Sequence, residues 1–287
     1  MPYPGPLLTS ETAAALRAAH AAGAPVWSGS LDLGRSRAVA DLRADGFGWA
    51  GRRWPWPEAL RERTIHYWNG AAWAPVQRFD SGLYKLVPTA WGPPTFEIDG
   101  IKMLPTARVS PWDDAASKAA LVEPRGKRIL DTCGGLGYFA AACHAAGAAD
   151  VRSFEKSATV LWLRGVNPWS PDSAAPEAGG RLTLVHGDIA QAVAGLPDAC
   201  FDACLHDPPR FGVAGELYAQ SFYGQLARVL RPGARMFHYT GAPNGVSHGR
   251  DLAREVALRL ERSGFQARRA LDGILAIRGR AGAAPRG

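Results

Sequence analysis

The stretch "RILDTCGGLGYFAAACHAAG", residues 128–147, decides the fold class of the chain. An apolar run that predicts a buried strand ends near Asp131, a glycine-containing turn follows it, and an alanine-rich run then predicts a helix. Strand, glycine turn and helix in this order typically open a nucleotide-binding α/β sheet. The turn contains Gly135-x-Gly137-x-x-Ala140, which satisfies the dinucleotide-binding fingerprint, so a nicotinamide or flavin cofactor has to be weighed.

The same alternation of short apolar strands and helices continues toward the C-terminus. Strands are expected at residues 128–133, 150–155, 181–188, 201–207, 234–241 and 267–279, and helices at residues 138–147, 158–166, 215–230 and 251–264. Strands that alternate with helices build a doubly wound, mainly parallel sheet through right-handed crossovers. We therefore predict an α/β, Rossmann-like domain over residues 110–287, with ligands bound at the carboxyl ends of its strands.

Residues 1–109 have a different pattern and hold most of the ten tryptophans of the chain. Asp-Gly and Asn-Gly pairs between apolar flanks favour type I′ hairpins, and this segment has three such pairs, namely Asp45-Gly46, Asn69-Gly70 and Asp99-Gly100. Helices are predicted over residues 10–23, with Ser10 as N-cap, and over residues 57–64. The segment is thus expected to form a small β-rich domain, mostly antiparallel, that binds the substrate or covers it as a lid.

Composition narrows the classes of function. A net charge of +7 with a pI near 9.5 suits a polyanionic partner such as RNA, but the arginines are spread along the chain, so RNA binding stays open. The four cysteines form no CxxC pair, so we expect a reducing, cytoplasmic location and neither structural zinc nor another metal. No apolar run approaches the ~18 residues that cross a bilayer, and no signal peptide is recognisable, so no membrane is expected.

Four acidic residues lie at or just after four consecutive predicted strands: Asp131, Glu155, Asp188 and Asp207. A carboxylate at Asp131 would repel a pyrophosphate across the glycine turn, whereas it would attract a cofactor that carries an ammonium group. S-adenosylmethionine has such an ammonium and no phosphate, and its ribose hydroxyls suit the carboxylate of Glu155. Each acid alone could be a helix cap, but their joint placement favours S-adenosylmethionine as the cofactor.

From about residue 110 to residue 280 the sequence resembles the class I S-adenosylmethionine-dependent methyltransferases. "ILDTCGGLG", "SFEK", "HGDIA" and "HDPPRFG" stand where that family has its glycine loop, ribose acid, adenine acid and catalytic loop. The resemblance implies a mainly parallel seven-stranded sheet and a cofactor-binding set of Asp131, Cys133, Gly135, Gly137, Glu155, Lys156, Asp188, Ile189 and Asp207. Cys133 departs from the pattern, because the family usually has a glycine at that place.

A narrower resemblance, over nearly the whole chain, is to a group of predicted, largely archaeal methyltransferases of unsettled substrate. The motifs that carry it include "SLDLG", "LYKLVPT", "PWDDAASK", "NPWS" and "FHYTG". The segment "AGELYAQSFYGQLARVLRPG" is also similar to the spermidine-synthase-like branch, which transfers an aminopropyl group from decarboxylated S-adenosylmethionine. Aminopropyl transfer is therefore an alternative to methyl transfer. A further alternative, from another class, is a non-catalytic RNA-binding protein that retains the fold.

The loop "LHDPPRFG", residues 205–212, is the predicted catalytic segment. Its two prolines remove backbone donors and stiffen the chain after Asp207. Similar Asp/Asn-Pro-Pro-aromatic motifs in amino-methyltransferases hold a nitrogen nucleophile with the carboxylate and a neighbouring carbonyl, so the resemblance assigns Asp207 and Pro208 to catalysis. Arg210 replaces the aromatic residue of those motifs and Phe211 follows it, and both are predicted to contact the substrate.

His238 and Tyr239, at the end of the predicted fifth strand, are further candidates for catalysis or substrate contact, whereas His206 is expected to be a core histidine. Trp169, in "NPWS", is a candidate wall of the adenine or substrate site. The resulting hypothesis is a methyltransferase that acts on a nitrogen nucleophile. Its acceptor stays open between an RNA base, a protein side chain and a small amine, and so does its oligomeric state, a homodimer included.

Overall fold

The computed structural model describes residues 3–172, 180–241 and 251–279, and the chain forms two compact units. The N-terminal unit comprises Met1–Asp114 and Trp162–Ser170, and the C-terminal unit comprises Ala115–Leu161 and Pro171–Gly287. The segment Trp162–Ser170 belongs to the N-terminal unit by its contacts, although the residues that precede and follow it in the sequence belong to the C-terminal unit.

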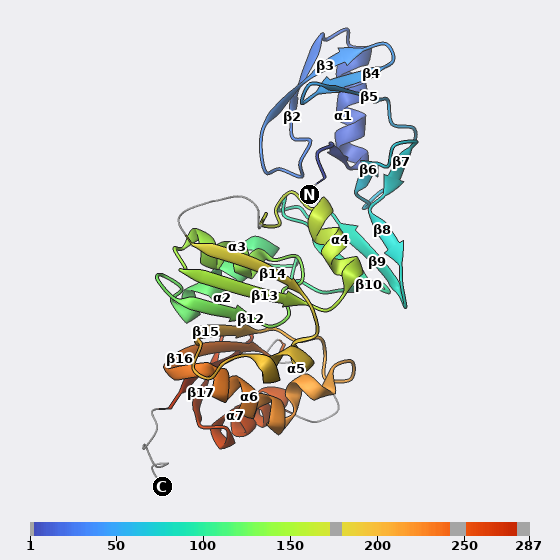
Figure 1. Cartoon of the computed structure of the whole chain (residues 1–287). Helices are drawn as coiled ribbons and strands as arrows, with labels where there is room; N and C mark the ends of the chain where they lie inside the picture. The colour runs from blue at the N-terminus through green and yellow to red at the C-terminus, as the bar shows by residue number, and fades with distance from the viewer. Residues whose placement is uncertain (1–2, 173–179, 242–250, 280–287) are drawn as a thin grey trace. The chain divides into compact units, whose positions relative to one another are not determined.

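The C-terminal unit contains a seven-stranded sheet (Figure 1) with the strand order β14-β13-β12-β15-β16-β18-β17. The strands are β12 (Arg128–Asp131), β13 (Asp150–Glu155), β14 (Arg181–His186), β15 (Phe201–His206), β16 (Leu230–Tyr239), β17 (Phe265–Ala270) and β18 (Gly273–Arg278). The pairs from β14 to β16 are parallel, and β18 runs antiparallel to both of its neighbours. This arrangement confirms the predicted Rossmann-like α/β class with a mainly parallel sheet of seven strands.

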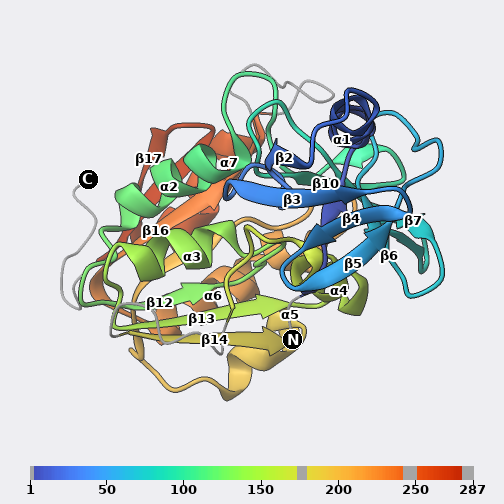
Figure 2. The same ribbon diagram turned by 90° about the horizontal axis from the view of Figure 1, so that it is seen from above.

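Helices cover both faces of this sheet, with α2 and α3 on one face and α5, α6 and α7 on the other (Figures 1 and 2). The helices are α2 (Pro111–Val122), α3 (Tyr138–Ala145), α4 (Ala158–Val166), α5 (Ile189–Ala192), α6 (Gln220–Val229) and α7 (Leu252–Arg262). The predicted helix over residues 215–230 is divided into a short 3-10 helix, Gly215–Tyr218, and α6, because Ala219 between them is extended.

The core of the C-terminal unit lies between the sheet and α6 and α7. Leu226 on α6 and Leu260 on α7 are fully buried against Met236 and Ile274 of the sheet. Burying such side chains stabilises the fold by about 1.5–3 kcal/mol each. The helices therefore fix the central strands, and with them the residues at the strand ends.

The segment predicted as one strand over residues 267–279 is instead a hairpin of β17 and β18, which corrects that prediction. The turn consists of Leu271 and Asp272, and Leu271 has a positive φ of 48°. The Asp272-Gly273 pair was the local signal for this turn. The hairpin supplies the antiparallel strand β18 next to β16, and so completes the sheet.

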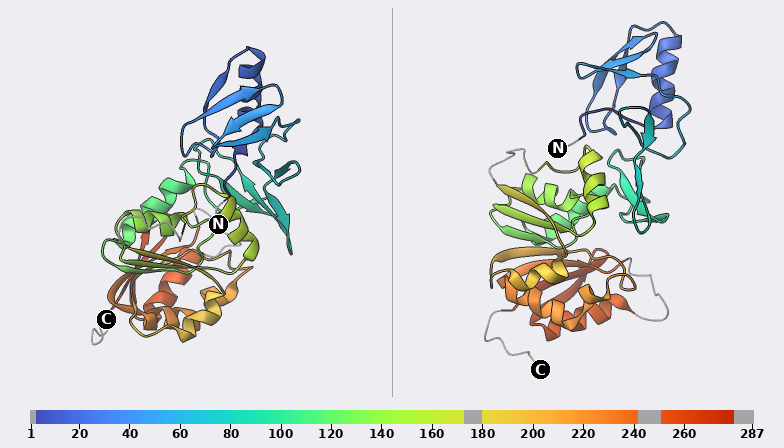
Figure 3. Two further views of the ribbon diagram at one scale, coloured as in Figure 1. Left: turned by 45° about the horizontal axis from the view of Figure 1, so that its top comes forward. Right: turned by 45° about the vertical axis from the view of Figure 1, so that its right-hand side comes forward.

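The described part of the N-terminal unit contains three small antiparallel sheets, the end of α4, the start of α2 and the helix α1 (Ser10–Ala21), which packs beside β2 and β3 (Figure 3). The sheets are β2-β3-β4-β5, β1-β6-β7 and β11-β10-β9-β8. Their strands are β1 (Leu7–Leu8), β2 (Val26–Gly29), β3 (Ala38–Arg43), β4 (Gly46–Trp49), β5 (Arg52–Pro55), β6 (His66–Trp68), β7 (Trp73–Pro75), β8 (Gln77–Phe79), β9 (Leu83–Val87), β10 (Thr95–Ile98) and β11 (Ile101–Lys102). Trp54 lies in the core of this unit, and Trp27, Trp49, Trp56, Trp68 and Trp73 pack against that core.

The three predicted hairpins form, but only one has the predicted turn. Asp99 and Gly100 have positive φ angles of 50° and 78° and join β10 to β11 as a two-residue turn. The β3–β4 turn is Ala44-Asp45, one residue earlier than predicted, because Arg43 pairs with Gly46. Asn69 and Gly70 lie in a longer loop, in which the Asn69 side chain accepts hydrogen bonds from the backbone N–H groups of the next turn residues.

Two helix predictions for the N-terminal unit need correction. The N-cap of α1 is Thr9, whose hydroxyl accepts from Thr12 N–H at 3.3 Å, so Ser10 is the first helical residue. Residues 57–64 contain no helix. Trp56 stands where an N-cap would be and offers no capping oxygen, so a helix over this short segment lacks a cap.

We expect Gly273→Ala to destabilise the C-terminal unit. A Cβ at this position would lie 2.2 Å from the His238 carbonyl oxygen, so β16 and β18 would have to move apart. The expected loss in the free energy of unfolding is about 1–3 kcal/mol, the usual cost of overpacking. Urea unfolding measures it, with Gly224→Ala as the control because open space surrounds that glycine. Equal midpoints for the two variants would contradict the close pairing of β16 and β18.

Candidate functional site

Three of the four predicted acids lie together at the carboxyl edge of the central strands. Asp131 is the last residue of β12, Glu155 is the last residue of β13, and Asp207 directly follows β15. Asp131 pairs in register with Ser153 on one side and with Leu205 on the other. Because these strands are parallel neighbours, their carboxylates meet at one edge. Asp188 follows β14 at the same edge, one strand beyond β13.

The glycine loop after β12 folds back against β13. Gly134 N–H donates to the Phe154 carbonyl at 2.7 Å, and Gly137 N–H donates to the Gly134 carbonyl at 2.7 Å. Gly135 and Gly137 have positive φ angles of 50° and 84°, which glycine adopts without a side-chain penalty. Gly135 N–H also donates to Glu155 Oε2 at 2.9 Å. The predicted glycines therefore bring the loop backbone onto the predicted ribose acid.

Asp131 is fully buried, and Ser153 Oγ donates to its Oδ2 at 2.7 Å. Burial raises the pKa of the neighbouring Cys133 thiol, and the charges of Glu155, Asp131 and Asp207 raise it further. A raised pKa disfavours the thiolate, so the structure gives Cys133 no nucleophilic character. The charges of all three acids therefore act on this side chain.

The acids nearest β14 are held by neighbouring groups. Glu155 Oε1 accepts from Ser157 N–H at 2.8 Å, and Lys156 Nζ pairs with Asp188 Oδ2 at 2.8 Å. The hydrogen bond and charge of Asp188 raise the pKa of Lys156. Asp188 also caps α5 through Ala190 N–H at 2.9 Å, so the alternative of a helix cap is correct for this residue. Its role toward adenine stays a prediction, as does that of Ile189, which is buried at the start of α5.

Lys118 on α2 is a site residue that sequence reasoning missed. Its side chain is 4% exposed, and Nζ donates to Asp207 Oδ2 at 3.2 Å. The ammonium also lies 4.6 Å from the centre of the Tyr239 ring, within the range of a cation–π interaction. A signal was present in the sequence, because Ala115, Ala119 and Val122 mark the buried face of α2 and Lys118 falls on that face.

The loop after Asp207 is held by Tyr218 of the following 3-10 helix. Tyr218 Oη donates to the Pro209 carbonyl at 3.1 Å, and burial together with the Asp207 charge raises the Tyr218 pKa. Pro208 is buried, whereas Arg210 and Phe211 are exposed, and the Phe211 ring meets the Tyr218 ring edge-on at 5.5 Å. The loop therefore has a fixed base and an exposed tip.

A buried pair of histidines lies beneath the site. The rings of His206 and His238 are 4.5 Å apart, and both residues are fully buried. His206 Nε2 donates to the Leu217 carbonyl at 3.0 Å, and its Nδ1 lies 2.8 Å from Thr132 Oγ1. His206 is thus the core histidine that the sequence predicts. Its bonds connect the glycine loop to the segment that follows the Asp-Pro-Pro loop.

His238 has both ring nitrogens occupied. Nδ1 donates to the Tyr239 carbonyl at 2.8 Å, which leaves Nε2 to accept from Tyr223 Oη at 2.9 Å. These bonds hold the end of β16 and orient Tyr239, which is half-buried. The geometry favours a positioning role for His238 and a contact role for Tyr239. Their catalytic assignment stays a prediction.

Trp169 lies in the N-terminal unit, among contacts of that unit. Its Nε1 donates to the Leu33 carbonyl at 3.0 Å, and its ring lies 5.9 Å from that of Trp112. Asn167 Oδ1 accepts from Trp169 N–H at 3.1 Å and so closes the turn after α4. The motif "NPWS" therefore has a structural explanation, and its role as a wall of the adenine site stays a prediction.

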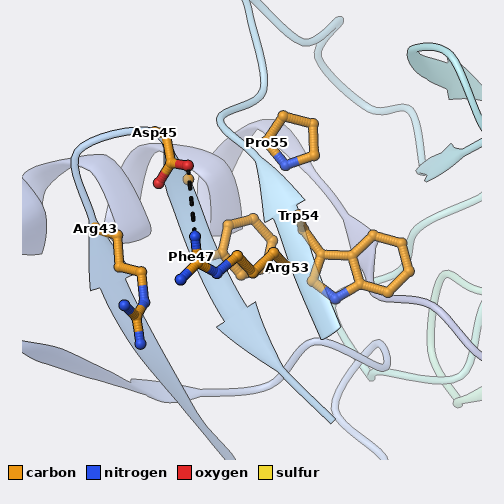
Figure 4. A pocket seen from close by; sticks show the side chains of 7 residues that line it. Arg43, Asp45, Phe47, Arg53, Trp54 and Pro55 are labelled. Carbon is orange, nitrogen blue, oxygen red and sulfur yellow. Dashed lines mark ion pairs between the residues drawn. The ribbon is translucent and has the colours of Figure 1, made fainter. Parts of the chain in front are cut away.

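The N-terminal unit also contains a shallow pocket of about 170 Å³ (Figure 4). Its lining consists of Arg43, Asp45, Gly46, Phe47, Arg53, Trp54 and Pro55. Arg53 and Asp45 pair at 3.9 Å, and both side chains are largely exposed. The pocket contains none of the predicted site residues, and its charges partly compensate one another, so it supports no functional assignment.

Over residues 3–172, 180–241 and 251–279, no helix is long and apolar enough to span a membrane. The same described residues contain no group of three or more histidine, cysteine or acidic side chains that could hold a metal ion.

Comparison with known proteins identifies relatives for part of the chain. No protein-family model matches it. The chain is 42% identical over 187 residues to an uncharacterized protein of Methanocaldococcus jannaschii, a match covering 65% of this chain and 62% of that protein. A shorter match is to polyamine aminopropyltransferase 2 of Streptomyces coelicolor, 36% identical over 63 residues, or 21% of this chain and 11% of that protein. The chain thus spans less than two thirds of either relative.

Solved structures with a similar fold include two spermidine synthases. One, in complex with the transition state analogue AdoDATO, has a TM-score of 0.55 at 15% identity, covering 71% of this chain and 73% of its own. The enzyme from Thermotoga maritima has a TM-score of 0.52 at 14% identity, covering 71% and 72%. MNMC2 from Aquifex aeolicus has a TM-score of 0.50 at 18% identity, covering 67% and 70%. At these identities the similarity establishes the fold alone, a Rossmann-like α/β sheet of the kind described above.

The histidine pair predicts a loss of stability in acid. Burial lowers the pKa of His206 from 6.5 to about 4, so the unfolded chain binds a proton in this window that the folded chain does not. The free energy of unfolding should therefore fall as the pH drops from 6.5 to 4, by about 3 kcal/mol for His206 alone. Urea unfolding at several pH values measures this slope. The His206→Gln variant should show a smaller slope, and an unchanged slope would contradict the assignment.

Proposed function

We propose that the chain is an S-adenosylmethionine-dependent methyltransferase that acts on a nitrogen nucleophile. The observation that carries this proposal is the row of carboxylates at the carboxyl ends of neighbouring parallel strands: Asp131, Glu155, Asp188 and Asp207. A row of acids suits a cofactor with a sulfonium and an ammonium group, and it opposes one with a pyrophosphate. The fold and the relatives described above support a transferase of this kind.

The residues of the edge fit this cofactor in a definite order. Asp131, beside the glycine loop, would face the ammonium, and Gly135 and Gly137 would allow the loop backbone to approach closely. Glu155, which already accepts from the N–H groups of Gly135 and Ser157, would accept from the ribose hydroxyls, because a carboxylate only accepts hydrogen bonds and a hydroxyl can donate one. Asp188 would accept from the adenine amino group, with Lys156 and Ile189 beside the ring.

The bound cofactor supplies an electrophilic methyl group on sulfur. An in-line displacement then depends mainly on holding the nucleophile about 3 Å from the methyl carbon in a dry, aligned site. Asp207 and the Pro208 carbonyl would accept the N–H groups of the acceptor and stabilise the positive charge that develops on nitrogen. The Tyr218 hydrogen bond to the Pro209 carbonyl keeps these acceptors in place.

Aminopropyl transfer is the second candidate, and the match to the Streptomyces enzyme favours it over a short segment. That reaction uses a decarboxylated cofactor and a cationic acceptor. Purified protein that formed spermidine from putrescine would overturn methyl transfer. The role of the N-terminal unit, as an RNA-binding surface or as a lid, belongs to the same proposal and follows from the identity of the acceptor.

We expect Glu155→Ala to weaken the binding of S-adenosylhomocysteine by about 1–3 kcal/mol, the scale of a charge-assisted hydrogen bond. The variant loses both the ribose acceptor and the partner of Gly135 N–H. Isothermal calorimetry measures the affinity, with Glu261→Ala, an exposed acid on α7, as the matched control. Tight NAD binding without a response to S-adenosylhomocysteine would reject the cofactor assignment.

We expect Asp207→Asn to lower the transfer rate by about 10²-fold while leaving cofactor affinity nearly unchanged, since one preorganised electrostatic contact is removed. The amide keeps an oxygen for Lys118, so the fold should persist. The assay supplies methyl-labelled cofactor to a cell extract that is then fractionated into RNA, protein and small molecules. Asp198→Asn, an exposed acid paired with Arg228, serves as the control. A near wild-type rate for Asp207→Asn would remove Asp207 from the mechanism.

A further inference from the structure

Lys118 places a positive charge where a polyamine would have to bind. Its ammonium is almost completely buried, and it contacts both Asp207 and the Tyr239 ring. A buried ammonium is costly unless it is paired, so Lys118 and Asp207 hold each other in this position. The side chain of Asp207 is still 25% exposed, so an acceptor can reach it.

The charges around the loop do not suit a cationic acceptor. Asp207 is balanced by Lys118, and the exposed Arg210 adds a positive charge to the loop, while the exposed Glu216 lies in the 3-10 helix that follows it. A polyamine needs carboxylates that are not already paired, because each of its ammonium groups loses hydrogen bonds to water on binding and needs protein acceptors in their place. A second ammonium beside the Asp207–Lys118 pair would meet like charge at short range, and such juxtapositions are strongly unfavourable.

A neutral acceptor meets no such repulsion. In the part of the chain that the structure describes, Lys118 binds Oδ2 of Asp207, and Oδ1 accepts no hydrogen bond. An uncharged amine can donate one N–H to Oδ1 and another to the Pro208 carbonyl. As the bond from sulfur to the methyl carbon breaks, its electron pair stays on sulfur, and the nitrogen lone pair forms the new bond. The positive charge moves from sulfur to nitrogen, which then releases a proton to water.

We infer that Lys118 determines the acceptor class: by pairing with Asp207 it reserves the site for an uncharged nitrogen acceptor and excludes polyamines. This inference rests on the proposed function, because it requires Asp207 to contact the acceptor. It also places a specificity-determining residue on α2, outside the motifs of the strand ends. Removing the lysine charge should convert the site into one that attracts cations.

The test measures polyamine binding to the full chain in the presence of saturating S-adenosylhomocysteine. Calorimetric titration with putrescine and spermidine should show at least about tenfold tighter binding to Lys118→Met than to the wild type, because like-charge repulsion is removed. Lys118→Gln provides a second variant if the first fails to fold. Lys127→Met removes one positive charge from a lysine paired with Glu123, and it should leave polyamine binding unchanged.

The double variant Lys118→Met with Asp207→Asn locates the effect, since it should lose the gained affinity. Equal polyamine affinities for the wild type and Lys118→Met would overturn the inference, as would tight spermidine binding by the wild type. The affinity for S-adenosylhomocysteine, measured first on the wild type, tests the proposed function separately. A wild type that binds this ligand, with no gain on removing Lys118, would reject the role of Lys118 alone.

Discussion

The parallel register of β12 with β13 and β15 determines which side chains share the carboxyl edge of the sheet. That register sets Asp131 opposite Ser153 and Leu205, and so brings three carboxylates to one sheet edge. Carboxylates so close together would repel one another in a site of low polarity. Each acid has a partner that offsets this repulsion. Ser153 donates to Asp131, backbone N–H groups donate to Glu155, and lysines pair with Asp188 and Asp207.

The groups that bind these acids differ in charge along the sheet edge, and this difference divides the edge into two parts. On the β12–β13 side Asp131 accepts from Ser153, and Glu155 accepts from the backbone N–H groups of Gly135 and Ser157. On the β15–β16 side Asp207 binds the buried ammonium of Lys118, so the local charge is balanced. The His206 and His238 rings contact each other; His206 is hydrogen-bonded to Thr132, which precedes the glycine loop, and His238 donates to the Tyr239 carbonyl. The proposed cofactor and acceptor regions therefore differ in the charge of the groups that hold their acids.

The sequence predicts most of what local patterns encode. The strand end at Glu155 was correct, and β12 ends at Asp131, two residues before the predicted end, because an apolar run followed by a charged residue and a turn is a local signal. The Asp99-Gly100 turn was correct for the same reason. The N-cap at Ser10 was wrong because the neighbouring Thr9 caps the helix. The helix over residues 57–64 was also wrong, since that segment contains no helix. Turn residues alone did not fix the register of the other two hairpins.

Lys118 and the histidine pair show what the sequence could not supply. Lys118 is separated from Asp207 by 89 positions, and only the packing of α2 against the strand ends brings them together. Its place on a buried helix face was a visible anomaly, but the identity of its partner was not. Likewise, Trp169 belongs by its contacts to the N-terminal unit, which the position of "NPWS" between two helices of the other domain did not indicate.

A crystal structure of the full chain with S-adenosylhomocysteine would test the central claim most directly. The account predicts that the ligand lies along the carboxyl edge of β12 to β15, with its ribose hydroxyls on Glu155, its ammonium near Asp131 and its sulfur beside Asp207. Electron density for the ligand at another place, or a ribose that does not contact Glu155, would contradict it.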